Sequence, residues 1–552
     1  MNKLKLHIMQ IIACLLLALV STTAMAQPAS VHKVGKSTFT LTTFDKDGGL
    51  IASVQGVFLD NKGTAVSMFK PFIGAAKATV HDASGKEHEV ESIMGANELY
   101  DVAKFRVKGA TQGIATGTID KGSAWLVPYS ISKPDFKQLK INRVEKFNTT
   151  YNYYVFTSSA PENAAGCPMT TTDGKVIGIM HRLGETTIAI DINFIASLAV
   201  NGLSSLDPAL RQTFIRTALP TEEKDAMTMM TLKKSENNPE QYRAFVDEYV
   251  SLFPTSTFGY RELAEIYAAA DNFEDADKTI QTALSKATDK AEVHSDYADL
   301  IYKKLVYKED KPFEKWTSDK ALQEAEAAYQ IKPEPAYRHQ QAQIQYIRKE
   351  YQKAHDLFIE LTNSKINNGE LYYEAAQCKT QLKAPDAEIK TLLDSAVNVG
   401  IRTGNAAPYY LARGAFLDKQ GKYREAVIDY LAYDTLAHPV NQQFFYTRYQ
   451  AEKNAKMWQL ALADIARCVI INPTEPIYFA EWVTLDLRVG RFEEAVKAAQ
   501  RYVELQPEAA EPYFFLGLAQ CQNNNKVEGL KNLQKAKEMG DNRAEEHIKK
   551  YK

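Results

Sequence analysis

The second half of the chain carries a small residue that recurs about every 34 positions. Ala426, Ala461 and Ala495 stand 35 and 34 positions apart, each in a segment with helical spacing such as RFEEAVKAAQRYVELQP. A unit of this length holds one pair of helices and cannot bury its apolar face alone, so neighbouring units must stack. The period therefore predicts an all-α superhelical solenoid. The complete column of expected packing positions is Ala276, Ala321, Ala354, Ala387, Ala426, Ala461, Ala495 and Gly529.

Other positions of this repeat resemble the tetratricopeptide repeat family. Gly414, Gly421, Tyr423 and Tyr430 stand where that family has its small residue, its turn glycine and its aromatics. Prolines 12 residues after the column alanine end the second helix of three repeats: Pro333, Pro473 and Pro507. The resemblance covers roughly residues 258–540, or about eight repeats, two of which are lengthened. It implies a concave groove that receives a peptide or a partner protein.

The first half of the chain, from Val34 to about Leu198, consists of short strand-like segments. STFTLTTF, SVQGVFLD and KVIGIMH are rich in valine, isoleucine, threonine and aromatic residues. Turn signals such as Asp173-Gly174 separate them. Many short strands at even spacing are typical of an all-β barrel or sandwich.

Three segments of this half occur in the order found in trypsin-like serine proteases of the HtrA-like kind. They are GVFLDNKGTAVSMFKPFIGA, KEHEVESIMGANELYDVAKFRV and NAAGCPMTTTDGKVIGI. The resemblance covers roughly residues 37–198, about a third of the chain. It implies a pair of six-stranded β-barrels with a catalytic triad between them in active members. The fold class expected for the whole chain is therefore a trypsin-like double β-barrel followed by an all-α solenoid.

The resemblance places the triad on residues that lack its chemistry. The histidine position falls on Lys70, the aspartate position on Asp101 and the serine position on Ala165. Asn163 replaces the glycine whose backbone N–H helps to form the oxyanion hole. Alanine has no nucleophilic atom, and lysine is a poor base unless it is strongly desolvated. No catalytic residue is expected, and Asp101 is expected to accept hydrogen bonds from backbone N–H groups.

An alternative interpretation makes Cys167 the nucleophile of a diverged endopeptidase. It lies two positions past the serine position, where a cysteine would need a neighbouring histidine as base. No histidine occupies the expected position, and although His81, His88 and His181 remain in this half, the strand position of His181 gives no reason to find it there. The simpler expectation is a small residue that fills a position beside a loop.

The N-terminus resembles a cleavable signal peptide. A basic start, MNKLKLHIMQ, precedes the short apolar segment IIACLLLALV, and Ala24 and Ala26 occupy the positions that signal peptidase reads. Cys14 lies inside the apolar segment, whereas a lipidated cysteine would end it. We expect export and a periplasmic location. The expected domains are a signal peptide (1–26), the trypsin-like domain (34–200), a linker or connecting helices (201–235) and the repeat domain (236–552).

Composition narrows the function classes. A formal net charge of −2 over 552 residues argues against a nucleic-acid binder, and no later segment is apolar enough to span a membrane. The cysteines lie far apart and form no metal-ligand motif, so neither metal nor cofactor is expected, and Cys167, Cys378, Cys468 and Cys521 are expected to be buried free thiols.

Three functional hypotheses follow. The first is an exported binding or scaffold protein that combines an inactive trypsin-like domain with a tetratricopeptide repeat array. The second is an active endopeptidase that uses Cys167 or another group, with the repeats recruiting substrate. The third makes the first half an unrelated β domain. The partner and the oligomeric state do not follow from the sequence.

Overall fold

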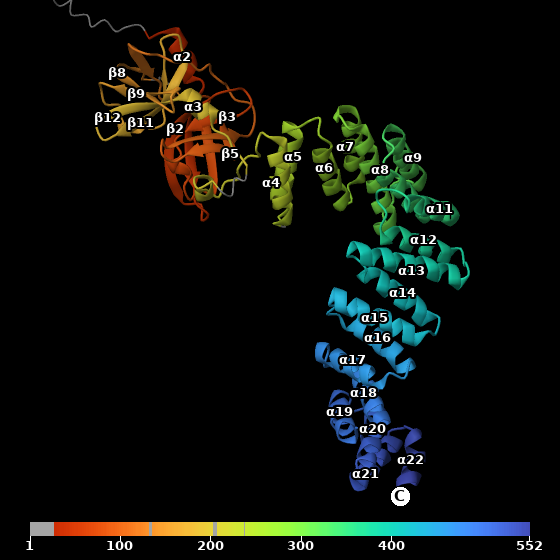
Figure 1. The fold of residues 1–552 in the computed structure, drawn as a ribbon. Helices are drawn as coiled ribbons and strands as arrows, with labels where there is room; N and C mark the ends of the chain where they lie inside the picture. Colours follow the sequence, from red (N-terminus) through yellow and green to blue (C-terminus); the bar gives the residue numbers. More distant parts are fainter. Residues whose placement is uncertain (1–26, 132–134, 203–206, 237) are drawn as a thin grey trace, which may run out of the picture. The chain divides into compact units, whose positions relative to one another are not determined.

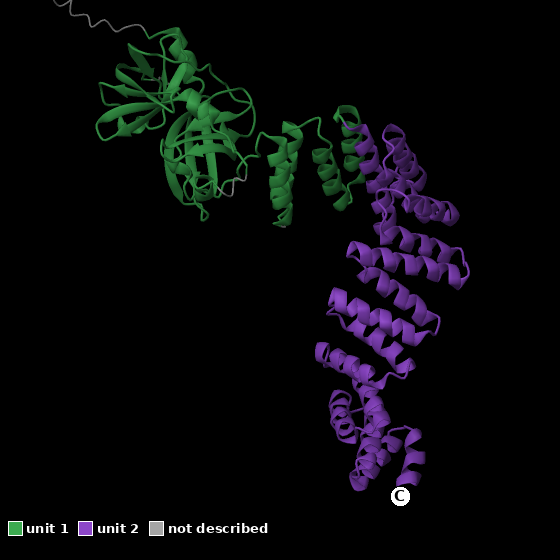
Figure 2. Ribbon diagram, in the orientation of Figure 1, with its two compact units in different colours: residues 1–288 green, residues 289–552 purple. Residues whose placement is uncertain are grey.

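The computed structural model describes residues 27–131, 135–202, 207–236 and 238–552. The predicted signal peptide, with Cys14, lies outside these residues. The expected fold class is confirmed, since two closed six-stranded β-barrels are followed by an all-α, solenoid-like region (Figure 1). The chain divides into two compact units, Met1–Thr288 and Asp289–Lys552 (Figure 2).

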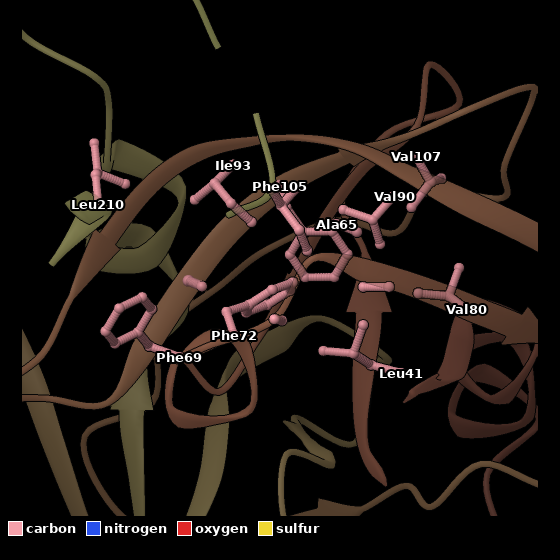
Figure 3. Packing of buried hydrophobic residues seen from close by; sticks show 14 of the residues in the cluster. Leu41, Ala65, Phe69, Phe72, Val80, Val90, Ile93, Phe105, Val107 and Leu210 are labelled. Carbon is pink, nitrogen blue, oxygen red and sulfur yellow. The ribbon is translucent and has the colours of Figure 1, made fainter. Parts of the chain in front are cut away.

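The first barrel closes six antiparallel strands in the order β1-β2-β3-β6-β5-β4. The strands are β1 (Thr38–Phe44), β2 (Leu50–Phe58), β3 (Thr64–Ser67), β4 (Lys77–Asp82), β5 (Glu87–Asn97) and β6 (Val102–Val107). Aromatic rings fill the interior: the Phe39 and Phe58 centroids lie 4.6 Å apart, and those of Phe72 and Phe105 lie 5.1 Å apart. Figure 3 shows Phe72 and Phe105 beside the aliphatic Leu41 and Val80. Large inward side chains from the strands, together with Phe72 from the 3-10 helix Lys70–Phe72, thus make this barrel a packed core.

The second barrel has the order β10-β11-β12-β9-β8-β7. Its strands are β7 (Ser123–Leu126), β8 (Lys137–Phe147), β9 (Tyr151–Phe156), β10 (Pro168–Thr170), β11 (Val176–Leu183) and β12 (Thr186–Asp191). β11, the KVIGIMH segment, is buried from Val176 to His181, because β10 and β12 flank it and apolar clusters cover it. The side chains on its two faces therefore pack in two different apolar clusters.

An apolar cluster joins the two barrels. Val57 of β2 and Val66 of β3 pack in one cluster with Val155 of β9 and Ile179 of β11. Residues 207–219, in the expected linker, also pack onto the first barrel: Leu210 and Ile215 join its core, and backbone hydrogen bonds connect Ile93 to Arg216 and Ala218. This stretch is therefore an integral part of the first unit.

The helices follow as antiparallel neighbours, each packed against the next within its unit. The first unit holds α4 (Glu223–Ser235), α5 (Pro239–Leu252), α6 (Thr257–Ala269) and α7 (Phe273–Lys286). The second holds α8 (Lys290–Tyr307), α9 (Ser318–Ile331), α10 (Pro335–Ile347), α11 (Tyr351–Leu361), α12 (Gly369–Gln381), α13 (Asp386–Thr403), α14 (Ala407–Lys419), α15 (Tyr423–Ala437), α16 (Gln442–Asn454), α17 (Trp458–Ile471), α18 (Pro476–Val489), α19 (Phe492–Leu505), α20 (Ala510–Gln522), α21 (Lys526–Glu538) and α22 (Arg543–Tyr551).

The column of small residues lies on the second helix of each pair, with one correction. Seven of its members are buried at the fourth position of their helices: Ala276, Ala321, Ala354, Ala426, Ala461, Ala495 and Gly529. Ala387 is exposed at the second position of α13, and the buried Ile389 takes the fourth position instead. Counting 33 residues from Ala354 therefore placed the packing position two residues too early, because the connection that precedes α13 differs in length.

Candidate functional site

Asp101 lies in the turn before β6, where it organises the segment that carries Lys70. Its carboxylate accepts hydrogen bonds from the backbone N–H of Phe69 (3.1 Å) and of Lys70 (2.7 Å). These are backbone hydrogen bonds of the kind expected for Asp101. The Lys70 side chain is 74% exposed and its Nζ lies 3.7 Å from the carboxylate, so this lysine is solvated. A lysine serves as a general base only when it is strongly desolvated, and Lys70 lacks that burial.

His181 approaches the same carboxylate from the second barrel. Its Nδ1 lies 3.9 Å from Asp101 Oδ2, beyond hydrogen-bond distance, and the ring is buried on β11. Nε2 has no hydrogen-bond partner among the described residues. Burial lowers the pKa of His181 to about 4, against the opposing effect of Asp101. The imidazole is therefore neutral at physiological pH.

The loop that carries Ala165 is fastened to β2 by Gln55. The backbone N–H of Gln55 donates to the Ala165 carbonyl (2.9 Å), and its Nε2 donates to the Asn163 carbonyl (2.7 Å). Gly166 has a φ of +82°, and a Cβ placed on it would lie 2.1 Å from the Gln55 carbonyl oxygen. The loop therefore lies directly against the first barrel at the position where the resemblance puts a nucleophile.

Cys167 faces the interior of the second barrel. Its thiol is fully buried, packs in one cluster with Met169 and Met180, and donates to Gln55 Oε1 at 3.0 Å. Burial raises the pKa of this thiol far above its ordinary value. Because the thiolate is the nucleophilic form, a buried thiol with a raised pKa is inert.

The other histidines of this half have their own partners near the turn between β4 and β5. His88 contacts the Lys108 carbonyl and the Asp82 carboxylate, at 2.9 and 3.1 Å, and His81 pairs with Glu87 at 3.1 Å. Across the described residues, no cluster of histidine, cysteine and acidic side chains could hold a metal ion. The site therefore has a carboxylate and a neutral imidazole, with an alanine at the nucleophile position.

Sequence reasoning gave no reason to place His181 beside Asp101. The two residues come from different barrels, and only the pairing of the barrels brings β11 to the turn before β6. Gln55 was likewise not singled out, because a glutamine in a strand has no distinctive sequence signal. The sequence identifies both side chains, but it does not show which residues they contact in the folded protein.

In the second unit, two arginines connect consecutive helix pairs. Arg413 on α14 donates to Asp394 on α13 (2.9 Å) and, through two nitrogens, to Asp429 on α15 (2.7 and 2.8 Å). Such bidentate pairs fix geometry as well as charge. Arg413 therefore ties its own helix pair to the preceding one.

Arg448 repeats this arrangement one helix pair further on and is more deeply buried. It donates to Asp434 on α15 (2.8 Å) and bidentately to Asp464 on α17 (2.5 and 2.7 Å), and its side chain is 2% exposed. Glu452 is also buried, 3.6 Å from Arg448 Nε, and burial together with Asp464 raises the pKa of Glu452 to about 8. Arg448 and Arg413 each precede their bidentate aspartate by 16 positions, a signal that was present in the sequence.

No model of a known protein family matches the chain, and no curated protein matches it significantly. Within the described residues, no helix has the length and apolar character needed to cross a bilayer.

We expect the first unit to lose stability in acid because of His181. Its pKa is about 4 in the folded protein and about 6.5 unfolded, so between these values only the unfolded chain takes up the proton. Protonation of His181 in the unfolded chain therefore leaves the free energy of unfolding unchanged above pH 6.5. It lowers this free energy by roughly 3 kcal/mol as the pH drops from 6.5 towards 4. Urea unfolding at several pH values measures this slope, which His181→Gln should make shallower.

The matched control for this measurement is His81→Gln. His81 is 41% exposed and pairs only with a surface carboxylate, so its replacement should leave the acid slope unchanged. Equal slopes for the parent and His181→Gln would show that the buried imidazole does not control acid stability.

Cys167 should resist thiol reagents in the native protein. Because the thiol is buried and hydrogen-bonded, labelling must wait for the barrel to open, and we expect it to be at least roughly a hundredfold slower than in urea. Mass spectrometry of the labelled peptide resolves Cys167 from the other cysteines. Equal labelling rates with and without urea would contradict the buried position.

Proposed function

We propose that the chain is an exported binding or scaffold protein, in which a trypsin-like domain without catalytic function and a tetratricopeptide repeat array hold a protein or peptide partner. The observation that carries the proposal is the loop at Ala165. The nucleophile position has no reactive atom, and Gln55 fastens this loop to the first barrel. A loop that has no nucleophilic atom and is held against the neighbouring barrel suits a structural role.

The base position supports the same reading. Lys70 is solvated, and among the described residues the imidazole near Asp101 is that of His181, which lies beyond hydrogen-bond distance of the carboxylate. General-base catalysis needs a base within hydrogen-bond reach of the nucleophile. The alternative endopeptidase with Cys167 is disfavoured by the burial of that thiol.

The helical array supplies the binding element of the proposal. Stacked helix pairs expose an extended surface that suits an extended peptide or a partner protein. The periplasm is the expected compartment, from the signal-peptide resemblance of the N-terminus. The array would then recruit its partner outside the cytoplasm.

Fluorescein-labelled casein tests binding and hydrolysis together, using the purified chain from Gln27 onward. We expect the fluorescence anisotropy of casein to rise, while no acid-soluble fluorescence is released above background. Cys167→Ala should behave as the parent does. Hydrolysis by the parent that Cys167→Ala abolishes would overturn the proposal in favour of a cysteine endopeptidase, and casein that neither binds nor is cleaved would overturn it as well.

A further inference from the structure

A groove in the second unit lies between α12 and α14, with the start of α13 beneath it. Its volume is about 620 Å³, within the range of pockets that bury small ligands. Residues of α12 at 373, 376, 377 and 380 face residues of α14 at 412, 415, 416 and 419. Both sets follow the i, i+3, i+4, i+7 pattern, so one face of each helix forms one wall.

The floor of this groove is apolar, and its walls carry both apolar and polar side chains. Ala376, Ile389 and Leu393 are buried in one cluster, against which the half-buried Tyr373 and Phe416 pack. Both rings keep part of their surface open to the groove. An apolar side chain of a ligand would remove this surface from water.

The rim at one end of the groove is positively charged. Lys383 follows α12 and Lys419 ends α14, and both side chains are exposed. Among the ion pairs of the described residues, neither lysine has a partner. Asp386, the one acid of the lining, begins α13, where the helix dipole favours a carboxylate. Two cations against one anion leave this end of the groove with a net positive charge.

We propose that this groove binds a peptide segment in which apolar side chains adjoin acidic residues. The apolar side chains of the ligand contact the open faces of Tyr373 and Phe416, and a ligand carboxylate pairs with Lys383 and Lys419. This inference rests on the proposed binding function and specifies the chemistry of the partner. A basic segment would face the two lysines and be disfavoured.

Three fluorescein-labelled synthetic peptides test this chemistry by fluorescence anisotropy with the chain from Gln27 onward. The first alternates leucine and aspartate between Gly-Ser flanks, the second has lysine in place of aspartate, and the third has serine in place of leucine. We expect the first to bind at least roughly tenfold more tightly than either of the others. Equal affinity of the first and second peptides would overturn the inference.

Variants of the groove residues test whether the first peptide binds in this groove. The double variant Lys383→Glu and Lys419→Glu should weaken binding of the first peptide by roughly tenfold or more. Ala415→Phe, at an exposed position on the wall, should fill the groove and weaken binding similarly. Circular dichroism checks that the helices of each variant are intact.

Lys349→Glu is the matched control. Lys349 is also exposed, has a φ of +62° close to the +54° of Lys383, and follows the first helix of another pair. Its reversal should leave binding unchanged. If the groove variants bind the first peptide and casein as the parent does, the inference fails and the proposed function stands. If the parent binds neither casein nor any peptide, the proposed function itself fails.

Discussion

Replacing Arg448 with alanine is expected to lower the free energy of unfolding of the helical array by about 3–5 kcal/mol. The substitution leaves Asp464 buried without its bidentate partner, beside the buried Glu452. An uncompensated charge in a low-dielectric interior costs far more than the pair contributed when intact. Urea unfolding followed by far-ultraviolet circular dichroism measures the loss, because the helices dominate that signal.

Arg467→Ala is the control for this prediction. Arg467 contacts the same two aspartates, Asp434 and Asp464, at 3.2 and 3.5 Å, but its side chain is 49% exposed. Solvent screens such a pair, so its loss should cost less than about 1 kcal/mol. A double variant, Arg448→Met with Asp464→Leu, should recover much of the stability, because it removes the charge and its partner together. If Arg448→Ala unfolds at the same urea concentration as the parent, the buried network is not a source of stability.

Gly166→Ala is expected to destabilise the first unit by two separate effects. A left-handed backbone costs an alanine roughly 1–2 kcal/mol. The new Cβ would also meet the backbone carbonyl of Gln55 at 2.1 Å, and forcing the strand and loop apart costs roughly 1–3 kcal/mol more. The near-ultraviolet circular dichroism of the barrels, followed during urea unfolding, reports the change.

Gly48→Ala separates these two effects. Gly48 has a φ of +81°, close to that of Gly166, but a Cβ there would have no neighbour within 4 Å. It should therefore show the backbone cost alone, roughly 1–2 kcal/mol. Equal losses for the two variants would mean that the close approach of the loop to Gln55 adds nothing to stability.

The strands and the helical period could be predicted because each depends on local pattern. Short segments rich in β-branched and aromatic residues, separated by turn signals, predicted strands in both barrels, and recurring small residues predicted the stacked helices. Ala387 shows where counting fails: the period carries on through the sequence, but a connection of different length shifts the helix that follows it. Position within a helix, which decided that Ile389 is the buried residue, cannot be read from spacing alone.

Apart from the backbone hydrogen bonds of Asp101 and the burial of Cys167, the candidate site was predictable only in the groups that it lacks. The sequence showed that the serine and histidine positions hold Ala165 and Lys70, because identity at a position is a local property. The approach of His181 to Asp101, and of Gln55 to the Ala165 loop, depends on how the two barrels pack. Such contacts join residues 80 to 112 positions apart, and no local pattern encodes them.

The two arginine bridges have a mechanical consequence for the helical array. In a linear stack each unit contacts only its neighbours, so fraying begins at an end and proceeds interface by interface. Arg413 and Arg448 strengthen two successive interfaces, between α13 and α14 and between α15 and α16. A pulling force applied at the C-terminus would unfold the last helices first. Helices α13 to α17, which the two arginines connect, should then unfold together in a single step.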